Sequence, residues 1–129
     1  MLDAAMNNIT SSMPPRRLSV VCLCAAWCGV CRDFLPAFEA LAKNHPNASF
    51  HRLDVEDEAD LLDDLDVENF PTLLLGVEGQ PVFFGTVLPQ TAMVERLLQQ
   101  APDMPALRAH EHHATLEAVL AHCQAAGGI

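Results

Sequence analysis

Four of the five cysteines in this chain lie within ten residues, at positions 22, 24, 28 and 31. This spacing leaves no loop for disulfides to close, so the set does not fit the disulfide framework of a small secreted protein. Cys28 and Cys31 form a C-x-x-C pair at the end of an apolar run that predicts a strand. If the pair opens a helix, the helix N-terminus favours a thiolate at the first cysteine, and the second lies one turn away. The pattern therefore indicates thiol–disulfide chemistry, in which the second thiol attacks a mixed disulfide on the first.

A zinc half-site and a purely structural role are the alternatives for Cys28 and Cys31. Structural zinc needs four ligands. The further candidate ligands are His110, His112, His113, His122 and Cys123. Histidines in such an arrangement more often form a solvated or interhelical polar cluster, and Cys123 lies on an apolar helical stripe. We therefore expect no metal and no cofactor, although the sequence leaves metal binding at His110, His112 and His113 open.

The apolar patterns predict an alternation of strands and helices that must position the cysteines. The first half of the chain should contain a strand buried on both faces (18–26), a helix from Arg32 to before Pro46 with Pro36 inside it, a strand (49–55) and a short helix (Leu61, Leu62, Leu65). A hairpin (71–77 and 80–85) should follow, turning at Glu78-Gly79. The chain should end with two helices: one from Pro89 to about Gln100 with Met93, Val94, Leu97 and Leu98 inward, and a last one with Leu116, Val119, Leu120 and Cys123 on one face, ended by Gly127-Gly128. This order implies a mixed sheet covered by helices on both sides.

The motif and element order resemble the thioredoxin family. The matching features are "WCGVC", Pro36 five residues after the second cysteine, and "FPT" at 70–72, within a similarity that covers about residues 18–100. The resemblance implies an α/β thioredoxin fold with a central mixed sheet flanked by helices and an additional C-terminal helix. We divide the chain into an N-terminal arm with a short helix (1–17), a thioredoxin-like domain (18–101) and a C-terminal helical extension (102–129).

The resemblance also assigns roles to individual residues. Cys28 is expected to be the exposed attacking nucleophile and Cys31 the buried resolving thiol, with Gly29 permitting the tight turn between them. Pro71, preceded by Phe70, is expected to be a cis-proline that lines the substrate groove. Trp27, Val55 and Gly85 are placed around the same groove.

Three positions depart from the family pattern or bear on it. Cys22 stands where thioredoxins usually place a buried Asp that takes a proton from the resolving thiol, and Arg52 stands in the position of the companion lysine. Val30 replaces the proline of reducing thioredoxins, which implies a disulfide that is easier to reduce. Cys22 and Cys24 are interpreted as small apolar core residues on alternate faces of the strand.

The sequence therefore predicts a protein-disulfide oxidoreductase that works through Cys28 and Cys31. It acts on protein disulfides without a cofactor and is recycled by an external reductant such as a thioredoxin reductase or the glutathione system. One alternative reverses the direction, as an oxidase or disulfide isomerase. Another is a thioredoxin-fold binding or assembly chaperone with little turnover, which the missing buried acid favours.

Charge and hydropathy limit the partners. The net charge is −10, and nine of the 17 acidic residues lie between Asp54 and Glu68 without a Lys or Arg. Such a surface repels nucleic acid and anionic membranes, and it is either a solvated helix face or a docking patch for a basic partner. The longest apolar run is too short to span a bilayer, and the first residues do not have the pattern of a secretory signal. We expect a cytoplasmic monomer.

Overall fold

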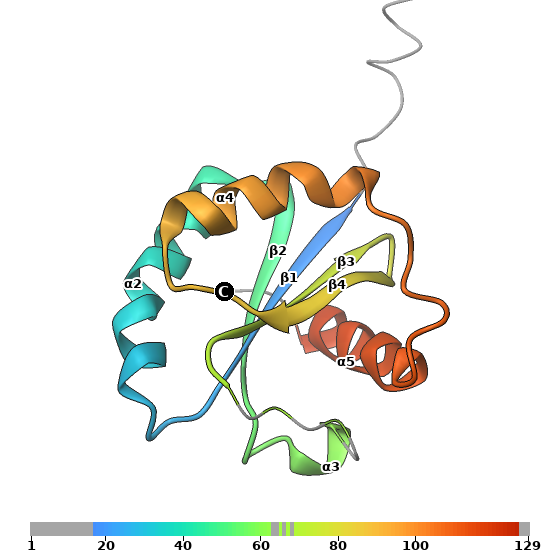
Figure 1. Ribbon diagram of the computed structural model, residues 1–129, viewed down its shortest axis with the longest axis horizontal. Coiled ribbons are helices and arrows are strands. Elements are labelled where there is room, and N and C mark those ends of the chain that lie inside the picture. The colour runs from blue at the N-terminus through green and yellow to red at the C-terminus, as the bar shows by residue number, and fades with distance from the viewer. Residues whose placement is uncertain (1–16, 63–64, 66, 68, 127–129) are drawn as a thin grey trace, which may run out of the picture.

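The computed structural model describes residues 17–62, 65, 67 and 69–126, and these contain a four-stranded mixed sheet (Figure 1). The strands are β1 (Leu18–Cys24), β2 (Ala48–Asp54), β3 (Thr72–Val77) and β4 (Gln80–Thr86). Their order across the sheet is β2-β1-β3-β4, with β1 parallel to β2 and antiparallel to β3, and β4 antiparallel to β3. The mixed sheet predicted from the element order is confirmed.

Helices cover both faces of the sheet (Figure 1). α2 (Gly29–Asn44) and α4 (Thr91–Gln100) lie on one face, and a 3-10 turn (Ala101–Asp103) follows α4. α3 (Ala59–Leu62) and α5 (His113–Ala126) lie on the other face. All seven residues of β1 are buried, because its alternate side chains enter the two cores. The continuous apolar run does mark a central strand buried on both faces.

α2 begins earlier than its apolar pattern indicates. The helix starts at Gly29, not at Arg32, because the Arg32 N–H already donates to the Cys28 carbonyl at 3.2 Å. Its buried face repeats at helical spacing through Cys31, Phe34, Phe38 and Leu41. The apolar pattern does not mark this first turn, because Gly29 and Val30 are exposed, but the C-x-x-C pair does. Cys28 is therefore the N-cap, and Cys31 belongs to the first turn of the helix.

The hairpin between β3 and β4 turns where the sequence predicts it. Glu78 and Gly79 have φ values of 54° and 82°, and two consecutive positive values suit the right-handed twist of a two-residue hairpin. Within β3, Gly76 allows α5 to approach the sheet closely. A Cβ atom at Gly76 would lie 2.6 Å from Cδ1 and 2.8 Å from Cδ2 of Leu120, which is fully buried.

α4 differs from prediction at its start and on one face. It begins at Thr91 with Gln90 as N-cap, not at Pro89, because the Gln90 N–H turns back onto the Leu88 carbonyl at 2.7 Å. Met93 is 40% exposed and does not face inward, whereas Val94 and Leu98 are buried as predicted.

The predicted inner face of the last helix is confirmed, since α5 buries Leu116, Val119, Leu120 and Cys123. The arm helix expected near the N-terminus and the Gly127-Gly128 helix end lie outside the described residues. In the part of the chain that the structure describes, no helix combines the length and apolar character needed to span a membrane.

Candidate active site

Cys28 occupies the junction between β1 and α2. Its backbone is extended, with φ −87° and ψ 118°, and its N–H donates to the Ala25 carbonyl at 3.0 Å. The side chain is half-buried at the N-terminus of α2. The backbone N–H groups of Cys31 and Val30 lower the pKa of Cys28, as does the positive charge of Arg32. A thiol with a lowered pKa that solvent can reach is a nucleophile at neutral pH.

Cys31 lies on the inner side of the same helix turn and is only 2% exposed. Burial raises the pKa of Cys31, and the neighbouring Cys24 thiol raises it further. The nearby Cys31 thiol also lowers the pKa of Cys28. One thiol of the pair is therefore accessible and acidic, while the other is shielded and protonated.

An aromatic and proline surface borders Cys28. Trp27 is 65% exposed and stands edge-on to Phe70, with ring centroids 5.8 Å apart. Its indole N–H donates to Oε2 of Glu56 at 3.1 Å, and this hydrogen bond fixes the orientation of the ring. The Phe70–Pro71 peptide bond is cis, as the resemblance implies. This border can contact an extended substrate chain beside the reactive sulfur.

Asp54 organises the two loops that meet at the site. Its Oδ2 accepts the Ala26 N–H at 2.9 Å, and its Oδ1 accepts the N–H groups of Glu56 at 2.8 Å and Asp57 at 3.2 Å. These three donors lower the pKa of Asp54, with the Glu56 N–H contributing most. The carboxylate thus ties the turn before Cys28 to the loop after β2.

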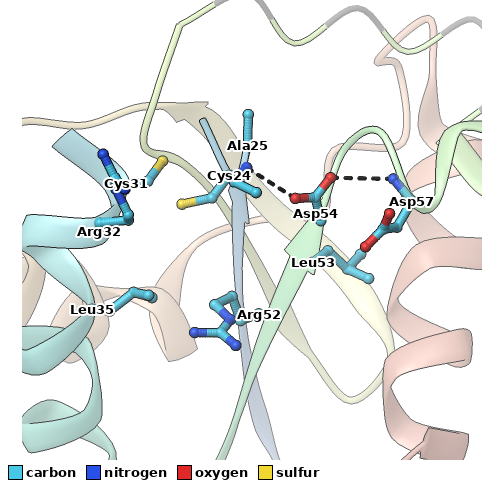
Figure 2. Close-up of a pocket in the computed structure, with 10 residues that line it drawn as sticks. Cys24, Ala25, Cys31, Arg32, Leu35, Arg52, Leu53, Asp54 and Asp57 are labelled. Carbon is cyan, nitrogen blue, oxygen red and sulfur yellow. Dashed lines mark hydrogen bonds between the residues drawn. The ribbon is translucent and has the colours of Figure 1, made fainter. Parts of the chain in front are cut away.

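A pocket of about 330 Å³ opens beside Cys31 (Figure 2). Cys24 and Cys31 line it with their sulfur atoms directed toward one another, and Arg52 lies below them (Figure 2). Arg32, Asp54 and Asp57 complete its polar lining. The pocket therefore gives solvent a path to the two buried thiols.

A family model described as Thioredoxin matches residues 4–98 of this chain. The chain belongs to the thioredoxin family. Thioredoxin H-type of Fagopyrum esculentum is 38% identical over 66 residues, which are 51% of this chain and 57% of the relative. Thioredoxin-1 of Saccharomyces cerevisiae is 36% identical over 76 residues, which are 59% of this chain and 74% of the relative.

Solved thioredoxins share the fold. The X-ray structure of Fasciola hepatica thioredoxin superposes with a TM-score of 0.61 at 26% identity, covering 76% of this chain and 92% of that one. The matched family region ends at residue 98, so α5 lies beyond it. The thioredoxin fold predicted from the motif is confirmed, and α5 is an addition that shares a core with β1 and β3.

Val55 and Gly85, both assigned to the substrate groove, lie in different parts of the structure. Val55 follows β2, and its N–H donates to the Cys24 carbonyl at 2.8 Å, which places it beside the junction. Gly85 pairs with Leu73 in the β3–β4 ladder. The residue that reaches Pro71 is Val87, whose N–H donates to the Pro71 carbonyl at 3.1 Å. Val87, two residues after Gly85, is thus hydrogen-bonded to Pro71, and a groove role for Gly85 remains a prediction.

Cys22 and Cys24 are both buried, but they lie on one face of β1. Their sulfur atoms are 3.4 Å apart, because side chains two residues apart in a strand point the same way. The prediction of alternate faces is wrong. Cys22 pairs in register with Arg52 of β2, yet the Arg52 side chain is exposed and lines the pocket with Cys24 and Cys31.

The histidines near α5 make local contacts. His113 pairs with Glu117 at 3.4 Å, His122 with Glu58 at 3.8 Å, and the His112 N–H donates to Nδ1 of His110 at 3.0 Å. Among the described residues, no group of three or more His, Cys, Asp or Glu side chains has an arrangement that could hold a metal ion.

Asp54 and Glu56 are the site residues that sequence reasoning missed. Both lie in the acidic stretch, where we interpreted the charges as a face and not as individual hydrogen-bond acceptors. The available signal was an Asp at the end of a predicted strand, a residue type that commonly accepts N–H groups two and three positions on.

Proposed function

We propose that this thioredoxin-family protein exchanges disulfides with protein substrates through Cys28 and Cys31. The observation that carries the proposal is the asymmetry of the pair. Cys28 is a half-buried thiol whose pKa is lowered at the N-terminus of α2, and Cys31 is a buried thiol whose pKa is raised. A fast attacking group beside a protected resolving group suits a two-step exchange.

In the reducing direction, the Cys28 thiolate attacks one sulfur of a substrate disulfide. A mixed disulfide forms and the other substrate sulfur leaves as a thiolate. Cys31 then loses its proton and attacks the Cys28 sulfur, which releases the reduced substrate and leaves a Cys28–Cys31 disulfide. An external reductant, either a thioredoxin reductase or two molecules of glutathione, returns two electrons to the pair.

The substrate surface consists of Trp27, Val55, Phe70 and Pro71 around Cys28. The exposed Trp27 ring offers a large apolar contact, and the backbone beside Pro71 supports pairing with an extended chain. The net charge of −10 favours substrates with a basic or neutral surface. We place the reaction in the cytoplasm and propose that a single copy of the chain is sufficient.

Trapping of the mixed disulfide tests the assignment. Cys31→Ser should accumulate a covalent complex with a disulfide-bonded substrate such as insulin, whereas Cys28→Ser should accumulate none. Iodoacetamide at neutral pH should label Cys28 first in the reduced wild type. Equal trapping by both variants, or first labelling of Cys22, would contradict the roles assigned to the pair.

A binding or assembly protein with little turnover is the second candidate. The observation that favours it is the surroundings of the resolving thiol. The buried Cys24 thiol lines the same pocket as Cys31 and raises the pKa of Cys31, and Cys22 stands where the family places its buried acid. Slow deprotonation of Cys31 would lengthen the lifetime of the mixed disulfide, so that substrate would stay covalently bound to Cys28. Multiple turnovers of insulin reduction with an excess of dithiol would exclude this candidate, and stable one-to-one complexes of the wild type would support it.

A further inference from the structure

The four clustered cysteines lie close together where β1 meets α2. Cys31 and Cys24 line the same pocket with their sulfur atoms directed toward one another (Figure 2), and Cys28 caps the helix turn that carries Cys31. The Cys24 sulfur lies 3.4 Å from the Cys22 sulfur. The two-step exchange uses only Cys28 and Cys31. Cys24 is the unused thiol that faces a reacting sulfur across the pocket.

We infer that Cys24 is a third exchanging thiol of this site, able to attack Cys31 in the oxidised protein and form an internal Cys24–Cys31 disulfide. The inference rests on the proposed function, since it starts from the Cys28–Cys31 disulfide. It adds a catalytic residue on the buried side of the pair and predicts a second oxidised form of the protein.

The step balances within the chain. The Cys24 thiol first loses its proton to water in the pocket, and the thiolate attacks the Cys31 sulfur. The Cys24–Cys31 bond forms while the Cys28–Cys31 bond breaks, and the electron pair leaves with the Cys28 sulfur. One disulfide replaces another, so no outside oxidant or reductant is consumed.

The local environment sets both the direction and the speed of this step. Cys28 is a good leaving group because its thiolate is stabilised by the N–H groups of Cys31 and Val30. Cys24 is a slow attacking group, because its hydrogen bond to Cys22 and its burial raise the pKa of the Cys24 thiol. The isomer, which has a Cys24–Cys31 disulfide and a free Cys28, should therefore form more slowly than a normal catalytic cycle. It should accumulate when the oxidised protein is left without a reductant.

The pocket beside the two sulfurs makes the step physically accessible. Cys24 and Cys31 are 6% and 2% exposed, yet both line the pocket of about 330 Å³ (Figure 2). This space admits water to accept the Cys24 proton and allows the side chain to rotate toward Cys31. In the isomer, Cys28 is free to form a mixed disulfide while Cys31 is unavailable to resolve it. The rearranged protein would then capture substrates without releasing them.

Removal of Cys28 gives a direct test that does not depend on the catalytic cycle. We expect Cys28→Ser, treated with diamide, to lose two thiols and to gain a Cys24–Cys31 disulfide. Chymotrypsin cleaves after Leu23, Trp27 and Phe34, so this bond would link peptide 24–27 to peptide 28–34. Adding Cys22→Ala should preserve the linkage, whereas adding Cys24→Ala should abolish it. A Cys22–Cys24 disulfide, or retention of all thiols in folded Cys28→Ser, would overturn the inference.

The wild type provides the second measurement. Oxidised protein incubated with iodoacetamide should slowly acquire one label on Cys28 while peptide 24–27 becomes linked to peptide 28–34. Folded Cys24→Ala, oxidised in the same way, should remain unlabelled at Cys28. Equal labelling of the two proteins would refute a role for Cys24. Failure of the Cys31→Ser trap, by contrast, would refute the proposed function and leave the Cys28→Ser result unaffected.

Discussion

The packing of Leu120 on Gly76 predicts a specific non-additive effect on stability. Leu120 is fully buried, so Leu120→Ala should cost about 3 kcal/mol of unfolding free energy. In Gly76→Ala the new Cβ would lie 2.6 Å and 2.8 Å from the two Leu120 methyl carbons, which is an overpacked contact. That substitution should cost about 1–2 kcal/mol, reduced slightly by the lower entropy of the unfolded chain.

The double variant should cost less than the sum of the single variants. The shortened side chain at position 120 lacks the methyl groups that clash with the new methyl group at position 76. That new methyl group also fills part of the space that Leu120 vacates. We therefore expect a coupling free energy of about 2 kcal/mol in favour of the double variant. In thermal unfolding, about 4 °C per kcal/mol for a domain of this size gives a decrease in Tm of about 12 °C for Leu120→Ala alone.

Urea unfolding followed by circular dichroism and by the fluorescence of Trp27, the single tryptophan, measures the four stabilities. Gly85→Ala is the matched control, because a Cβ at Gly85 would meet only the Phe83 ring, at an ordinary distance of 3.5 Å. Gly85→Ala and Leu120→Ala should be additive. If Gly76→Ala and Leu120→Ala are also additive within about 0.5 kcal/mol, α5 does not pack on β3 as described.

Three further predictions concern the active site. Val30→Pro should fold, because proline is tolerated in the first helical turn. The substitution removes an N–H near the Cys28 sulfur, so the reduction potential of the Cys28–Cys31 disulfide, measured against glutathione, should become more negative by up to about 30 mV. Asp54→Ala should lower the unfolding free energy by about 1 kcal/mol, because the three N–H donors lose their acceptor. The stability difference from wild type should disappear as the pH falls through the pKa of Asp54, which lies below its ordinary 3.8, because the wild-type carboxylate is then protonated. Acid unfolding curves of the two proteins measure this. In the native reduced protein, brief iodoacetamide treatment should add one label, at Cys28, because the other four cysteines are buried. Intact-mass measurement checks this, and two or more labels would contradict the burial.

The sequence predicted the elements that depend on continuous patterns. The apolar run from Leu18 identified the central strand, because both of its faces meet a core. Glu78-Gly79 identified the hairpin, because the glycine readily adopts the positive φ that its place in the turn requires. The C-x-x-C pair located the helix N-terminus, and the Phe70–Pro71 bond is cis as expected.

Details that depend on three-dimensional register were less predictable. Pro89 suits the first turn of a helix, but the hydrogen bond between Gln90 and Leu88 delays α4 until Thr91. The groove contact depended on how far β4 extends beside β3, and Val87, two residues after Gly85, is hydrogen-bonded to Pro71. The role of Asp54 required knowledge that the loops after β1 and β2 meet in space. The start of α4, the groove contact and the meeting of the two loops therefore have no local pattern in the sequence.

The placement of α5 has a consequence for the order in which the chain can fold during synthesis. The core under α2 and α4 can close once residue 101 has left the ribosomal exit tunnel, because none of its buried members lies beyond Ala101. The other core still lacks Leu116, Val119, Leu120 and Cys123. Val21, Leu23 and Leu74 therefore remain open to water, or to a chaperone, until α5 leaves the ribosome. In a nascent chain, Cys28 and Cys31 should therefore reach their positions while one face of the sheet is still uncovered by α5.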